Sequence, residues 1–171
     1  MFASLTLVAA LTAAPSNDLT ISNFRSGLAC TRSTPAKDRE GWICQPTELI
    51  LITDQGDCVY DGKKELCTWH GFEFDYSASK PGMKLQCVTR SDIPADVGNP
   101  EGVEAKDTTS TSYEIELPQQ TGHLYNPQYY VFQTHPLGKT DRIEETDCSH
   151  NGVVVFKMRF RFRFPTLPTT R

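Results

Sequence analysis

The sequence predicts an all-β fold, an antiparallel two-sheet β-sandwich of immunoglobulin-like or jelly-roll-like form that is stapled by disulfides. Apolar and polar residues alternate with period two in many short runs rich in Phe, Tyr, Val, Ile and Thr, and turn-forming Gly, Pro, Asp and Asn separate these runs. Short strands with regular turns are typical of sandwiches and barrels. Six cysteines without the C-x-x-C spacing of zinc sites and redox motifs favour disulfides and therefore an oxidising compartment.

The alternation and the turn signals place the strands along the chain. Asp61-Gly62 and Asn151-Gly152 are among the turn signals, and residue 70 separates two of the predicted strands. In chain order, the predicted strands are residues 18–24, 27–32, 41–45, 48–53, 57–60, 65–69, 71–77, 83–90, 112–118, 128–134 and 152–164.

The chain of 171 residues has the length of a single domain. Residues 1–14 contain an apolar run followed by small residues, and they are predicted to be a signal peptide or an apolar N-terminal strand. Residues 15–165 form the predicted β domain, and residues 166–171 form a frayed tail after Pro165. Beyond the N-terminal run no apolar stretch approaches the roughly 20 residues that span a bilayer, so the mature chain is expected to lack a transmembrane span.

The disulfide pairing follows from spacing and elimination. A four-residue loop over residues 61–64 places Cys58 opposite Cys67 in a hairpin, within disulfide reach. Cys30 and Cys44 flank a polar run suited to a second hairpin loop, and Cys87 and Cys148 remain as the third pair.

Residues 91–112 are predicted to be a long loop, because they combine several Pro, Gly and acidic residues with few apolar ones. A mobile or loosely packed loop is favoured over a binding loop. Its acidic residues lack the order of a calcium-binding loop, so no metal site is expected there. These acids are Asp92, Asp96, Glu101, Glu104 and Asp107.

Residues 156–164 alternate without a slip between large apolar and basic side chains. In a strand the two kinds of side chain face opposite ways, so Phe156, Met158, Phe160, Phe162 and Phe164 are predicted to form a core strand. Acids of residues 72–76 or 113–117 on a neighbouring strand are expected to pair with the cations. The alternatives are a polyanion-binding face and an edge strand that another subunit completes. The cationic row is Lys157, Arg159, Arg161 and Arg163.

No catalytic residue and no cofactor are predicted, since the sequence contains no G-x-S-x-G elbow, no H-E-x-x-H motif and no Gly-rich phosphate loop. The sequence pI of about 5.5, with aromatic and basic residues on opposite faces, does not favour nucleic-acid binding. The sequence therefore predicts a non-enzymatic periplasmic or extracellular protein that acts as a binding or structural module, with a protein or glycan partner or by self-assembly. The alternatives are a filament or envelope subunit joined by strand donation, an inhibitor of a secreted hydrolase, and a polyanion-binding protein.

Overall fold

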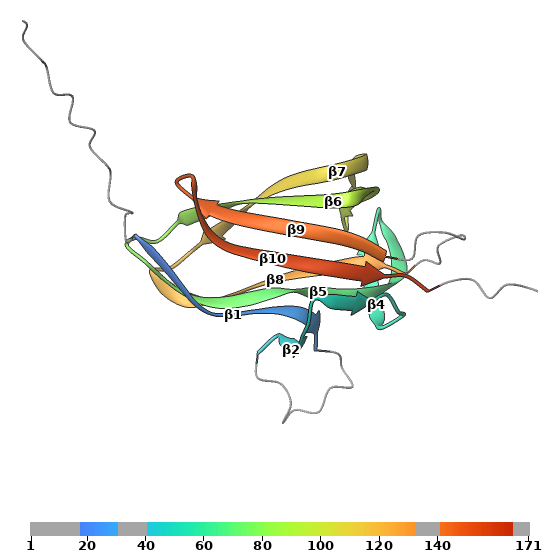
Figure 1. Cartoon of the computed structure of the whole chain (residues 1–171), viewed down its shortest axis with the longest axis horizontal. Coiled ribbons are helices and arrows are strands. Elements are labelled where there is room, and N and C mark those ends of the chain that lie inside the picture. Colours follow the sequence, from blue (N-terminus) through green and yellow to red (C-terminus); the bar gives the residue numbers. More distant parts are fainter. Residues whose placement is uncertain (1–17, 31–40, 133–140, 166–171) are drawn as a thin grey trace, which may run out of the picture.

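The computed structural model describes residues 18–30, 41–132 and 141–165, and every regular element in these ranges is a strand (Figure 1). The fold is the predicted disulfide-stapled sandwich of two sheets, while the predictions for residues 1–14 and 166–171 lie outside the described ranges. No helix in these ranges is long and apolar enough to cross a membrane. The strands are β1 (Leu19–Ala29), β2 (Ile43–Pro46), β3 (Leu49–Leu51), β4 (Gly56–Tyr60), β5 (Lys63–Ala78), β6 (Met83–Asn99), β7 (Gly102–Leu117), β8 (Thr121–Val131), β9 (Asp141–His150) and β10 (Val153–Arg163).

The two sheets are built around the long strands. In the first sheet the order is β2-β1-β5-β4, and β8 also pairs with β5. In the second sheet the order is β3-β10-β9-β6-β7, and β3 runs parallel to β10 whereas the other pairs are antiparallel. β5 lies inside the first sheet, and β10 lies between β9 and the short strand β3 in the second (Figure 1).

The core lies between β5 and β10. Phe72, Phe74 and Tyr76 of β5 are buried and face the apolar side of β10. The predicted core residues of the last strand are all buried, namely Phe156, Met158, Phe160, Phe162 and Phe164. Burial of a large apolar side chain stabilises a fold by about 1.5–3 kcal/mol, so this face contributes much of the stability.

β5 is one strand of 16 residues, so the predicted interruption at residue 70, between strands 65–69 and 71–77, is wrong. Gly71 has φ +148°, and a Cβ there would collide with the carbonyl oxygen of Asn126 on β8. The glycine thus permits a close approach of β8 inside a continuous strand, a position where glycine is the natural residue.

The predicted loop over residues 91–112 is wrong as well, because these residues form most of β6 and β7. The Asn99 side chain accepts hydrogen bonds from the N–H groups of Glu101 and Gly102 and closes a tight hairpin turn. β6 pairs with β9 only as far as Ser91, and three register irregularities follow between Arg90 and Gly98. Bulges bend strands, so the outer part of β6 and β7, residues 92–107, leaves the sheet as a two-stranded ribbon.

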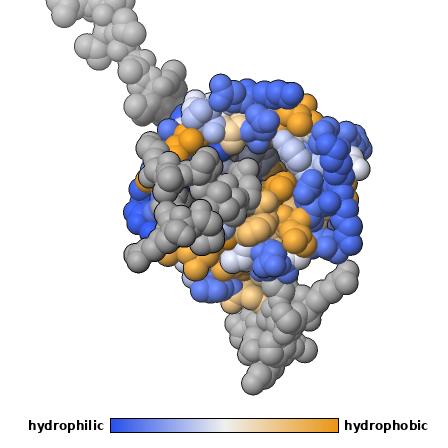
Figure 2. Space-filling view, turned by 90° about the vertical axis from the view of Figure 1, so that its right-hand side faces the viewer, coloured by the Kyte–Doolittle hydropathy of each residue, from blue (hydrophilic) through white to orange (hydrophobic). Residues whose placement is uncertain are grey.

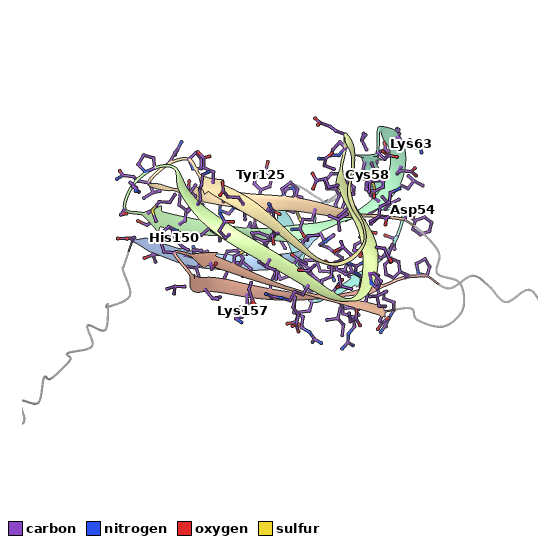
Figure 3. All side chains as sticks on the ribbon, turned by 90° about the horizontal axis from the view of Figure 1, so that it is seen from above. Asp54, Cys58, Lys63, Tyr125, His150 and Lys157 are labelled. Carbon is purple, nitrogen blue, oxygen red and sulfur yellow. A yellow bond between two sulfur atoms is a disulfide. The ribbon has the colours of Figure 1, made fainter. Side chains whose placement is uncertain are left out.

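The ribbon crosses from the second sheet to the first. Its tip is tied to the β4–β5 turn, where the N–H of Gly62 donates to the carbonyl of Pro100 at 2.9 Å. Figure 3 shows β6 and β7 curling toward this turn, close to the labelled Cys58 and Lys63. The ribbon therefore forms an arch over one end of the sandwich.

β9 was missed by the sequence analysis, although it lies between β10 and β6. Its inward residues Arg142, Glu144 and Thr146 are polar, so the apolar alternation that marks a strand is absent. β8 likewise begins at Thr121, seven residues before the predicted strand 128–134.

The three disulfides are the predicted pairs Cys30–Cys44, Cys58–Cys67 and Cys87–Cys148. The predicted register around Cys58 is wrong, because Asp61 and Gly62 alone make the turn and Cys58 lies opposite Glu65. Both turn residues have positive φ, as a two-residue Asp-Gly hairpin turn requires. The Cys58–Cys67 bond is consequently diagonal across the hairpin.

Candidate functional site

A cavity of about 750 Å³ lies beneath the arch, between the ribbon, β8 and the first residues of β9. Figure 2 looks onto this end of the molecule, where hydrophobic residues gather in a hollowed middle with hydrophilic residues around them. Four tyrosines line the cavity together with ionisable residues of the sandwich interior. The tyrosines are Tyr60, Tyr113, Tyr129 and Tyr130.

A buried ion pair faces the cavity from β9. Nη2 of Arg142 lies 2.9 Å from Oε1 of Glu144, and the two side chains are only 8% and 15% exposed. The same Nη2 donates to Oγ of Ser91 at 3.0 Å. The hydroxyl of Tyr130 donates to Oε1 of Glu144 at 3.2 Å, and the guanidinium lies 5.6 Å from the Tyr130 ring centre. The pair is thus held by β6, β8 and β9 together.

Burial dominates the electrostatics of this cluster. It raises the pKa of Glu144, and the opposing effect of the Arg142 charge is smaller. Burial also raises the pKa of Tyr113 to about 12 and raises that of Tyr130. Ionisable groups with shifted pKa values that gather at one cavity are a recognised mark of functional sites.

His70 forms the inner wall of the cavity from β5. It is 2% exposed, and burial lowers its pKa to about 4, so the imidazole is neutral at pH 7. Its ring packs edge-on against Phe160 and Phe162. Within the described residues, Nδ1 of His70 and Nε of Arg142 have no hydrogen-bond partner. A buried polar atom without a partner costs about 1–3 kcal/mol, so this end of the interior is not optimised for stability.

The predicted cationic row lies on the outer face of β10, and three of its members pair with β9. Lys157 lies 3.0 Å from Asp147, Arg159 lies 3.3 Å from Glu145, and Arg163 binds Asp141 through two hydrogen bonds of 2.9 and 3.0 Å. Lys157 is labelled on this outer side in Figure 3. Arg161 lies opposite Ile143 and makes no ion pair with any residue of the described ranges.

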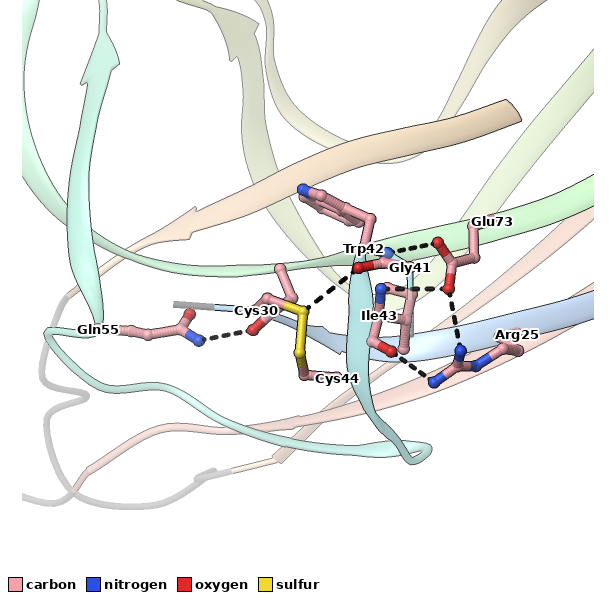
Figure 4. Close-up of a disulfide and its surroundings, with 9 residues drawn as sticks. Arg25, Cys30, Gly41, Trp42, Ile43, Cys44, Gln55 and Glu73 are labelled. Carbon is pink, nitrogen blue, oxygen red and sulfur yellow. Dashed lines mark hydrogen bonds and ion pairs between the residues drawn. A yellow bond between two sulfur atoms is a disulfide. The ribbon is translucent and has the colours of Figure 1, made fainter. Parts of the chain in front are cut away.

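The acids of residues 72–76 and 113–117 were expected to pair with the cationic row. In the structure, Glu114 and Glu73 pair with other residues instead. Glu114 of β7 lies 2.6 Å from Lys84 of the neighbouring β6. Glu73 is 1% exposed and accepts hydrogen bonds from the backbone N–H groups of Trp42 and Ile43 at 2.6 and 3.3 Å (Figure 4). Arg25 lies 3.5 Å from the same carboxylate. Glu73 therefore holds β2 and its disulfide against the first sheet.

The predicted absence of a metal site is not contradicted by these positions, since no three His, Cys, Asp or Glu residues in the described ranges are arranged to hold a metal ion. Asp92 accepts the backbone N–H of Ile143, and Asp96 accepts that of Asp107. His123 lies on the first sheet beside Glu73 and Asp75, which raise its pKa. His135 is outside the described residues.

The cavity residues Arg142, Glu144, Tyr130 and His70 were not singled out by the sequence analysis. One signal for them exists in the sequence, the period-two spacing of Arg142, Glu144, Thr146 and Cys148. These polar residues can be recognised as inward-facing only when residues 141–150 are known to form a central strand. Chemically, the cluster offers hydrogen-bond donors, acceptors and aromatic faces.

Comparison with known proteins places the chain in no family. No family model matches it, and no curated protein matches it significantly. Among solved structures it is similar to the alkylpurine DNA glycosylase AlkC of Pseudomonas fluorescens bound to DNA containing an abasic site analog, with a TM-score of 0.35 and 13% sequence identity. The matched region covers 85% of this chain and 30% of the glycosylase chain. A similarity at this level carries no argument about function.

Proposed function

We propose that the protein is an exported, non-enzymatic binding module that holds a small ligand in the cavity beneath the arch. The observation that carries this proposal is the cavity of about 750 Å³ into which the buried Arg142–Glu144 pair faces. Ligand sites typically have volumes of about 300–1,000 Å³, with mostly apolar and aromatic walls and a few polar groups that orient the ligand.

The polar groups of the cavity support binding over catalysis. The Thr89 hydroxyl shares a hydrogen bond of 2.7 Å with Thr146, and the Ser91 hydroxyl contacts the Ile93 carbonyl and Arg142. Neither hydroxyl is hydrogen-bonded to His70 in the described part of the chain, and a nucleophile needs such a base. The cluster orients groups rather than activating one.

Three disulfides support export, because such bonds persist in oxidising compartments. The test is the intact mass of the native protein before and after reduction and alkylation. We expect six cysteines to be alkylated only after reduction and the mature chain to begin near residue 15. Free thiols in the native protein would contradict export.

Binding in the cavity is tested with benzyl alcohol, a small neutral aromatic probe, by nuclear magnetic resonance titration. Ala95→Phe places a ring into the cavity and is expected to abolish binding. Ala105→Phe is the matched control, since Ala105 lies on the opposite strand of the same ribbon and outside the cavity lining. Equal binding by both variants would contradict a site beneath the arch.

A second candidate function, assembly by strand donation, is favoured by one side of β10. β3 pairs only with Arg161–Arg163, and in the described residues no strand pairs with Val153–Phe160 on that side. Val153 and Val154 are 58% and 46% exposed there. An open edge of this kind accepts a strand from another chain. Loss of oligomers in a Val154→Lys variant, measured by sedimentation, would support it, and a wild-type monomer would exclude it.

A further inference from the structure

We propose that the ligand of the cavity is an organic cation, an amine or a quaternary ammonium, whose charge lies beside Asp96 and whose body lies among Tyr60 and Tyr129. This inference rests on the proposed binding function and assigns the chemical class of the ligand. It follows from the charges that line the cavity, from the aromatic rings in the same lining, and from the acidic ribbon above them.

The charged residues that line the cavity are unbalanced. Among the described residues, the lining contains three acids, Asp96, Asp141 and Glu144, and one basic side chain, Arg142, while His70 is neutral. Glu144 is neutralised by Arg142, and Asp141 is neutralised by Arg163. Asp96 makes no ion pair with the residues that the structure describes. The free charge of the cavity is therefore negative.

Tyr60 and Tyr129 line the same cavity as this carboxylate. The Tyr60 ring packs against the ribbon backbone, because a Cβ on Gly98 would lie 3.1 Å from its Cε2 atom. The pKa of Tyr60 is raised by burial and then by the Asp96 and Asp61 carboxylates. The pKa of Tyr129 is raised by burial and then by Tyr60. All three side chains line one cavity, and aromatic faces together with a carboxylate are a typical environment for a bound ammonium ion.

The Tyr129 ring is fixed in position. Its hydroxyl donates to the carbonyl of Val59 at 2.6 Å, and its ring centre lies 5.0 Å from that of Trp69. A ring held from two sides loses little conformational entropy when a ligand packs on it, which favours binding.

The ribbon adds a longer-range attraction for cations. Residues 92–107 hold five acids against Lys106. These acids are Asp92, Asp96, Glu101, Glu104 and Asp107, whose order in the sequence does not match a calcium-binding loop. A cleft with walls of one sign concentrates ions of the opposite sign, so the arch directs cations toward its own cavity. The attraction weakens as salt screens it.

The test compares three probes that share one ring and differ in charge: benzyltrimethylammonium, benzyl alcohol and benzoate. We expect the ammonium to bind about tenfold more tightly than the alcohol, and benzoate to bind more weakly than both. Asp96→Asn keeps the oxygen that accepts the Asp107 N–H, and it is expected to reduce ammonium binding to the level of the alcohol.

Glu101→Gln is the matched control. It removes one negative charge from the turn of the same ribbon but lies outside the cavity lining, so it is expected to leave the tenfold preference in place. Equal affinity for the ammonium and the alcohol, or tighter binding of benzoate, would overturn the cation assignment while the binding function stands. Failure of all three probes to bind would overturn the binding function together with it.

Discussion

At one end of the sandwich, the rings of Phe72, Phe74 and Phe156 pack at centroid distances of 5.3 to 6.2 Å within the hydrophobic core. At the other end, the same two strands carry His70 and Phe162, and they meet Arg142 and Glu144 of β9. We call the first region the dry core, because its buried side chains are apolar and closely packed. The second region contains the cavity and, among the described residues, two buried polar atoms without a hydrogen-bond partner.

The difference arises from the strand that covers each end. Where β6 stays in the sheet, Leu85 and Cys87 face the core and complete it. Beyond Ser91 the ribbon leaves the sheet, so apolar side chains no longer fill the space. The comparison indicates that one region provides stability and the other provides the site. Substitutions in both regions and on the outer face of β10 test this division.

The largest effect is expected from Phe74→Ala in the dry region. Phe74 is fully buried, and removal of a buried phenylalanine ring costs about 3–5 kcal/mol. Chemical denaturation measures the loss. Phe132→Ala serves as the control, because Phe132 is 36% exposed and should cost less than about 1 kcal/mol. Similar losses in the two variants would mean that the first region is not the source of stability.

Arg142→Met in the cavity region is expected to cost about 3 kcal/mol, because it leaves Glu144 buried without its cation. Adding Glu144→Leu should restore most of this stability, since replacing both members of a buried ion pair by apolar residues is often neutral. Denaturation of the single and double variants provides the measurement. A double variant as unstable as the single one would show that the pair is needed for stability, not retained for a site.

His70 links stability to pH. Its folded pKa of about 4 lies below the ordinary value of 6.5, so the unfolded chain takes up the proton first as the pH falls. The free energy of unfolding should therefore decrease by about 3 kcal/mol from this residue between pH 6.5 and pH 4. Comparison with His70→Phe across this range isolates the effect. A constant difference between the two proteins at all these pH values would contradict it.

The smallest effects are expected on the outer face of β10. Arg163→Glu breaks the two hydrogen bonds to Asp141 and places like charges opposite each other, which should lower the unfolding temperature slightly. Arg161→Glu lies opposite Ile143 and should change stability by less than about 0.5 kcal/mol. Thermal unfolding at low and high salt measures both. An Arg161 effect as large as that of Arg163 would point to a partner for Arg161 outside the described residues.

The two regions also differ in how much of them the sequence predicted. Strict alternation in residues 156–164 and 72–76 marks the dry core, because apolar side chains at period two have no other stable arrangement. The cavity was not predicted, because its strand β9 carries Arg142 and Glu144 inward and its ribbon resembles a loop in composition. Polar residues become strand residues there through pairing with distant parts of the chain, which no local pattern reveals. The disulfide pairs were predicted, whereas the register of Cys58 depended on which turn residues the hairpin used.

The most direct test of the division maps the bound probe on the molecule. Amide chemical shifts are followed while benzyltrimethylammonium is added to the native, disulfide-bonded protein. The account predicts that the shifts cluster around the cavity, at Val97, Thr111 and Val131, while Leu85 and Leu117 of the dry core stay unchanged. Shifts centred on the outer face of the first sheet, around Trp42 and Tyr125, would contradict a binding site beneath the arch.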